Sequence, residues 1–140
     1  MWKLTRQPHR VFARNPLLAV VFAVDFEPIL KIGEGKSIPD FQELIRARFP
    51  SFTEGEVMEF EIKAPGNFET RQEKAFEFSA SGDLKVVLAP RRLSRDARVH
   101  WSRDELYDDI RLILGALQEV YKPIVITRVG LRYINLFDRV

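Results

Sequence analysis

Two arginines on either side of a glycine lie near the end of the chain, in the pattern Arg128-x-Gly130-x-Arg132. Side chains alternate between the two faces of a strand, so these three residues should share one face. Two guanidinium groups over a glycine make a recess that could hold a phosphate or a carboxylate by paired hydrogen bonds. Alternatively, each arginine bonds to an acidic residue of a neighbouring strand, such as Glu59 or Glu61.

A second pattern, Glu59-x-Glu61-x-Lys63, places two carboxylates and an amine on one face of a predicted strand. The carboxylates could bind Mg²⁺ and the lysine could bind a phosphate. These five positions resemble the Glu-x-Glu-x-Lys signature of the triphosphate-tunnel fold shared by thiamine triphosphatases and class IV adenylyl cyclases. The resemblance implies a Mg²⁺-dependent phosphate-processing enzyme, to which Arg128 and Arg132 would contribute. A solvated strand face explains the same residues, so both interpretations stay open.

The most basic stretch of the chain runs over positions 91–101, and its residues 91–100 are predicted to be a loop. Its basic and aromatic residues are Arg91, Arg92, Arg95, Arg98, His100 and Trp101. Together with the arginines near the N-terminus, they could follow a nucleic-acid backbone, with Trp101 or His100 stacking on a base. In the alternative interpretation the loop is simply solvated, and Trp101 packs against the helix that follows. We take Arg91, Arg92, Arg95 and Trp101 as candidate contacts to a ligand or partner.

Other kinds of site are not indicated by the sequence. The two histidines, His9 and His100, are far apart in the chain and there is no cysteine, so we expect no metal site. Gly33 and Gly35 form an isolated Gly-x-Gly rather than a phosphate-binding loop, and there is no nucleophile elbow around a serine. We therefore expect no cofactor and no dedicated catalytic machinery.

A long amphipathic helix is predicted to begin at Ser102. Ser102-Arg103-Asp104-Glu105 has the form of a capping box, and Trp101 and Leu106 could flank it as a hydrophobic staple. Apolar residues then recur at spacings of three and four, and Pro123 ends the helix. The stripe consists of Leu106, Ile110, Ile113, Leu114, Leu117, Val120 and Tyr121.

Strands and one further helix surround this element. Ser37 is predicted to cap a helix that ends near Pro50. Residues 17–26 alternate large and small apolar side chains, which favours a central strand over a signal peptide. The other predicted strands are 58–64, 76–80, 84–88 and 124–137. This order, β-α-β-β-β-α-β, predicts an α+β fold with an antiparallel or mixed sheet of about five strands and two helices on one face.

Size and composition fit one domain over residues 1–140, with a basic lead at 1–15. The chain is 46% apolar, contains 11 Phe among its 140 residues, and must be stabilised by packing because it has no cysteine. The absence of cysteine fits a reducing compartment, and no apolar run approaches the roughly 20 residues that cross a bilayer. We predict a cytoplasmic protein without a membrane partner.

Several segments together resemble the first half of a sporadically distributed, uncharacterised prokaryotic protein family. They are Asn15–Phe26, Ile38–Arg46, Trp101–Leu106 and, most specifically, the closing Thr-Arg-Val-Gly-Leu-Arg-Tyr-Ile-Asn at Thr127–Asn135. The resemblance implies a fold and brings no activity with it. Members of that family continue for about as long again.

The function expected from these features is a non-catalytic binding or interaction module. It would act through the sheet edge formed by the last strand, as a homo-oligomer or with a partner chain. Arg128 and Arg132 would lie at the contact. The two alternatives are nucleic-acid binding by the arginine patches and the Mg²⁺-dependent enzyme of triphosphate-tunnel type.

Overall fold

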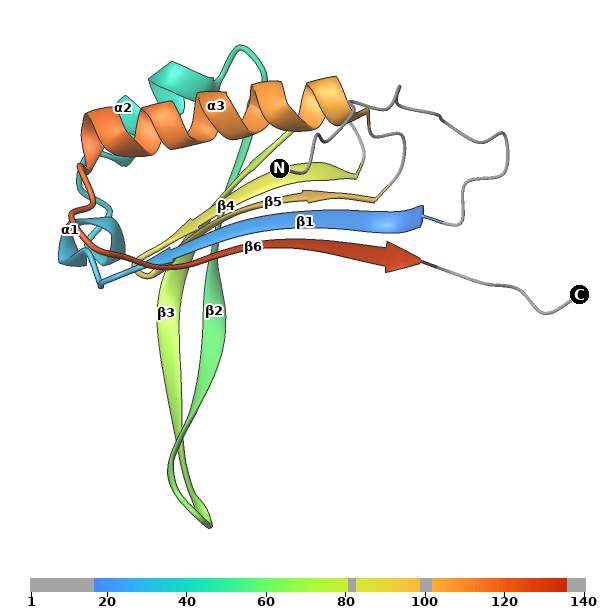
Figure 1. The fold of residues 1–140 in the computed structure, drawn as a ribbon. Helices are drawn as coiled ribbons and strands as arrows, with labels where there is room; N and C mark the ends of the chain where they lie inside the picture. The colour runs from blue at the N-terminus through green and yellow to red at the C-terminus, as the bar shows by residue number, and fades with distance from the viewer. Residues whose placement is uncertain (1–16, 81–82, 99–101, 136–140) are drawn as a thin grey trace, which may run out of the picture.

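The computed structural model describes residues 17–80, 83–98 and 102–135. One antiparallel sheet of six strands, in the order β2-β3-β4-β5-β1-β6, has the helices on one face (Figure 1). In chain order the elements are β1 (Leu17–Phe26), α1 (Leu30–Gly33), α2 (Ile38–Ile45), β2 (Ser51–Ala64), β3 (Asn67–Ser79), β4 (Leu84–Ala89), β5 (Arg92–Ala97), α3 (Arg103–Val120) and β6 (Ile126–Asn135). The predicted α+β class is confirmed, with one strand and one short helix, α1, more than expected.

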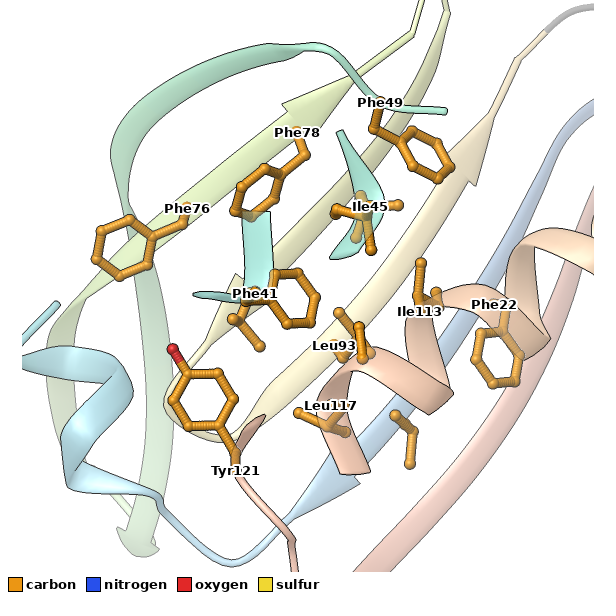
Figure 2. Close-up of a cluster of buried hydrophobic side chains, with 14 of the residues drawn as sticks. Phe22, Phe41, Ile45, Phe49, Phe76, Phe78, Leu93, Ile113, Leu117 and Tyr121 are labelled. Atoms are coloured by element: carbon orange, nitrogen blue, oxygen red, sulfur yellow. The ribbon is translucent and has the colours of Figure 1, made fainter. Parts of the chain in front are cut away.

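The hydrophobic core lies between the helices and one face of the sheet, which we call the helix side (Figure 2). Phe41 of α2 lies at its centre, with its ring centroid 5.4 Å from that of Phe78 on β3 and 6.3 Å from that of Tyr121 after α3. Ile113 and Leu117 of α3 are buried against the same layer. The apolar stripe predicted for α3 is therefore the face that packs on the sheet.

The N-terminal end of α3 is capped as predicted, because Ser102 Oγ accepts a hydrogen bond from the Glu105 amide at 3.1 Å. Trp101, the other half of the proposed staple, lies outside the described residues. Ser37 is the N-cap residue of α2, as predicted, but the capping hydrogen bond expected from its side chain is not formed. Ser37 has a left-handed φ of 63°, and Pro39 does lie in the first turn.

β1 is a central strand, as its two-faced sequence predicted. It pairs with β5 on one side and with β6 on the other, both antiparallel. Val20, Phe22, Val24 and Phe26 are buried on the helix side. The alternate residues, including Val21, Ala23 and Asp25, lie on the opposite face, which carries no helix and which we call the open side.

β5 is the additional strand, and it occupies most of the segment that was predicted to be a basic loop. Leu93, Arg95 and Ala97 are buried on the helix side, and Arg92 is exposed. The prediction is wrong because Arg95, a charged residue, occupies an inward position and hides the alternation typical of a strand. An acid on α3, described below, compensates its charge.

The β2–β3 hairpin is much longer than the part of it that joins the sheet. β3 pairs with β4 only over Phe76–Ser79, whereas β2 and β3 pair along nearly their whole length. The remainder, residues 55–75, extends away from the body of the molecule and is called the arm (Figure 1). The sequence predicted one solvated and one covered face here. Met58 and Ile62 on the expected covered face are instead exposed.

No helix among the described residues is long and apolar enough to cross a bilayer.

Candidate functional site

β6 is one of the two edge strands of the described sheet and the centre of the candidate site. It pairs with β1, and no other described strand lies on its outer side. An edge strand presents unpaired backbone amide and carbonyl groups, which can pair with a further strand. We call this strand, Ile126–Asn135, the β6 edge.

On the helix side, the β6 edge carries an exposed apolar row. Val129, Leu131 and Tyr133 are 65%, 44% and 47% exposed. Each lies opposite a β1 residue that is almost completely buried, because Val24 pairs with Val129, Phe22 with Leu131 and Val20 with Tyr133. Burial under the helices therefore ends between β1 and β6, and no helix of the described part of the chain covers this row.

On the open side, Arg128, Gly130 and Arg132 lie side by side, as the alternation predicted. They line a recess of about 410 Å³ that extends over β1 to Arg92 on β5. The remaining lining residues are Val21, Ala23, Asp25 and Leu131. A Cβ added at Gly130 would lie 4.0 Å from Arg128 Nε, an ordinary van der Waals contact, so the recess does not require a glycine at this position.

The recess holds three guanidinium groups and one carboxylate. Asp25 accepts two hydrogen bonds from Arg92, at 2.5 Å from Nε and 3.0 Å from Nη2. Arg128 and Arg132 are exposed, and neither forms an ion pair with another side chain in the described part of the chain. The recess therefore retains positive charge that is not neutralised by Asp25, and it can accept an anionic group.

The acids named as alternative partners of these arginines lie elsewhere. Glu59 and Glu61 belong to β2, at the opposite edge of the six-stranded sheet from β6. Lys63 is on the same distant strand, and the side chains of all three residues lie outside the described part of the structure. The triphosphate-type enzyme would need the acidic and lysine residues of β2 in one site with the arginines of β6. The strand order does not bring these two sets together within one chain.

The arginines of the basic stretch do not form one patch either. Arg91 donates a hydrogen bond to Glu73 at 3.2 Å, Arg92 joins the recess, and Arg95 points into the core. Trp101 lies outside the described residues, so its role as a contact remains a prediction. Of the candidates in this stretch that are described, only Arg92 adds to the surface formed by Arg128 and Arg132.

An acidic residue that the sequence did not single out organises the buried charges. Asp109 of α3 accepts from Arg95 Nε at 2.9 Å and from Arg48 Nε at 2.9 Å. The hydrogen bond to Asp109 raises the pKa of the Arg48 guanidinium above its usual value. The sequence contains one indication that Asp109 is buried. It lies three residues after Leu106 and four before Ile113, which places it on the apolar stripe of the helix.

No protein-family model, curated protein or solved structure matches this chain. The family resemblance drawn from the sequence therefore stays a prediction, and the residues of the β6 edge are the basis for any proposal about function.

Proposed function

We propose that this protein is an interaction module that accepts an extended segment as an additional strand on the β6 edge. The observation that carries the proposal is the exposed row of Val129, Leu131 and Tyr133 on an edge strand. In strand addition the edge supplies backbone hydrogen bonds, and the alternating side chains supply selectivity. An added strand would also cover apolar surface that the helices leave exposed.

The two faces of the β6 edge define the chemistry of the segment. Residues of the added strand that point to the helix side would meet Val129, Leu131 and Tyr133, so apolar residues fit there. Residues that point to the open side would meet Arg128 and Arg132, so acidic residues fit there. The preferred segment therefore alternates apolar and acidic residues.

A peptide-binding experiment tests this proposal. A fluorescent peptide of alternating isoleucine and glutamate should bind the protein, and a peptide of the same composition in scrambled order should bind at least about tenfold more weakly, a difference of about 1.4 kcal/mol. N-methylation of alternate peptide amides should abolish binding, since it removes backbone donors. Leu131→Lys should weaken binding, and Leu30→Lys, at an exposed position on α1, should leave it unchanged. Equal binding of the ordered and scrambled peptides would rule out strand addition.

Nucleic-acid binding is the second candidate, favoured by the meeting of Arg92, Arg128 and Arg132 in one recess. It predicts that single-stranded RNA or DNA binds at low salt and is released as salt increases. Arg128→Gln with Arg132→Gln should remove this binding. Absence of a complex at low salt removes this candidate and leaves strand addition unaffected.

A further inference from the structure

The arm carries an exposed apolar row of its own. Met58, Ile62 and Phe68 are 59%, 70% and 67% exposed, and Ile62 lies directly opposite Phe68 across the hairpin. Phe52, whose ring lies 5.3 Å from that of the core residue Phe78, is on the same face of β2, and Glu54 and Glu56 lie between it and Met58. The apolar row of the arm thus lies on the strand face that continues the helix side, and the two glutamates separate it from the core.

A two-stranded hairpin is at best marginally stable in water, and it gains stability when its apolar face is covered. β2 is also an edge strand, since it pairs with β3 and with no other described strand. The arm therefore has two features that a docking segment needs: an unpaired backbone edge and an exposed apolar row.

The direction of the strands makes the two edges of the sheet compatible. Each of the five pairings between β2 and β6 is antiparallel, so β2 runs opposite to β6. A second copy in the same orientation beside the first would present β2 to β6 as an antiparallel neighbour. The helix sides of the two copies would then face the same way. Met58 and Ile62 of the second copy would therefore lie next to the apolar row on β6 of the first copy.

The charges of the two edges are also complementary. β2 contains four glutamates and one lysine, whereas β6 contains two arginines and no acid. In its sequence, β2 alternates Met58, Phe60 and Ile62 with Glu59 and Glu61, which is the apolar-acidic order that suits the β6 edge. Pairing β6 with β6 of another copy would instead bring four arginines to one junction, which is unfavourable.

We propose that the segment accepted by the β6 edge is the arm of a second copy of this chain, an inference that rests on the strand-accepting function proposed above. Each copy has one arm and one β6 edge. Copies joined in this orientation leave one arm and one β6 edge free at the ends, so successive copies can join in a ring or a fibre. In every case the contact is between two different surfaces.

Two variants that each block one surface test this inference. Val129→Lys with Leu131→Lys blocks the β6 edge, and Met58→Lys with Ile62→Lys blocks the arm. All four positions are exposed in the single chain, so both variants should fold, which circular dichroism checks. The milder pairs Val129→Thr with Leu131→Thr and Met58→Ser with Ile62→Ser replace any variant that fails to fold. Leu30→Lys is the control for an added surface charge.

Native mass is then measured by light scattering. The wild-type protein and Leu30→Lys should have a multiple of the 16.3 kDa chain mass, and each blocked variant alone should have 16.3 kDa. An equimolar mixture of the two blocked variants should give a species of twice that mass, because it contains one intact arm and one intact β6 edge. If the contact joined two identical surfaces, a mixture of the two blocked variants would not form such a mixed pair. The mixed pair therefore distinguishes an arm–β6 contact from a contact between identical surfaces.

Other results overturn the inference in distinguishable ways. If blocking β6 gives monomers and blocking the arm does not, β6 accepts a strand other than the arm, and the proposed function stands. If both blocked variants keep the wild-type mass, the inference fails and so does a role for the β6 edge in self-association. A monomeric wild-type protein at every concentration also overturns the inference, and peptide binding then decides the proposed function.

Discussion

Arg95 of β5 and Asp109 of α3 form an ion pair in the core, with 2.8 Å between Arg95 Nη2 and Asp109 Oδ2. The two residues are 1% and 3% exposed. Arg48, which is partly exposed, donates to the other oxygen of the same carboxylate. One aspartate thus connects α3 both to the sheet and to the segment that follows α2.

Removing this carboxylate should destabilise the protein strongly. Asp109→Leu leaves the guanidinium of Arg95 buried without a counter-charge, which should lower the free energy of unfolding by about 3–5 kcal/mol. Urea unfolding measures the loss. Asp108→Leu, at an exposed neighbour on the same helix, should change the free energy by less than about 0.5 kcal/mol. The double variant Arg95→Met with Asp109→Leu should recover most of the stability, and a loss in it as large as in Asp109→Leu would contradict this account.

Two phenylalanines of β3 should differ sharply in their importance for stability. Phe78 is fully buried beside Phe41, so Phe78→Ala should lower the free energy of unfolding by about 3–5 kcal/mol. Phe68 lies near the tip of the arm and is largely exposed, so Phe68→Ala should cost less than about 0.5 kcal/mol in a monomeric sample. Comparable losses in the two variants would show that the arm packs against its own chain.

Stability should decrease at high pH because of Tyr121. Burial, with a smaller effect from Asp40, raises the pKa of its phenol from 10.0 to about 12. Below pH 10 the phenol is neutral in both states. Between pH 10 and 12 the unfolded chain loses the proton first, so the free energy of unfolding falls as the pH rises.

Tyr121→Phe provides the comparison for this titration. The variant lacks the 3.0 Å hydrogen bond from the phenol to the carbonyl oxygen of Lys36, which should cost about 1 kcal/mol at pH 8. It also lacks the titrating group, so the difference between wild type and variant should shrink from pH 10 to 12. Chemical unfolding across this range measures the difference, and a constant value would show that Tyr121 does not titrate with a raised pKa.

Two serines at helix starts form a matched pair. Ser102→Ala removes the hydrogen bond from the Glu105 amide and should cost about 1 kcal/mol. Ser37→Ala removes no capping bond, so its effect should be smaller. Thermal unfolding of both variants checks the order, and a larger effect at Ser37 would contradict the assignment of the cap.

The parts of the fold that could be predicted from the sequence are those encoded locally. The helix α3 has its cap at Ser102 and an apolar stripe that only Asp109 interrupts, and β1 has a two-residue alternation. β5 could not be recognised because Arg95 occupies an inward position, and the acid that compensates it lies 14 residues later in a different element. A buried charged residue whose partner is distant in the sequence cannot be told, from the sequence alone, from a charged residue of a solvated loop.

The candidate site was predictable only along its own strand. The shared face of Arg128, Gly130 and Arg132 follows from strand alternation. The contribution of Asp25 and Arg92 depends on β1 lying between β5 and β6, which is a matter of strand order. The exposure of Met58 and Ile62 was missed for a similar reason, because alternation shows that a face is apolar and does not show whether another element covers it.

The position of β1 between β5 and β6 also has a consequence for the order of folding. β2, β3, β4 and β5 pair with their neighbours in the sequence, whereas Ala23 pairs with Gly130, 107 residues away. Closing so long a loop is entropically costly, so we expect the β1–β6 pairing to form after the β2–β5 meander. Pulsed hydrogen exchange during refolding should show β3 and β4 amides protected before those of β6. The strand that we propose as the docking surface would then be the last to join the sheet.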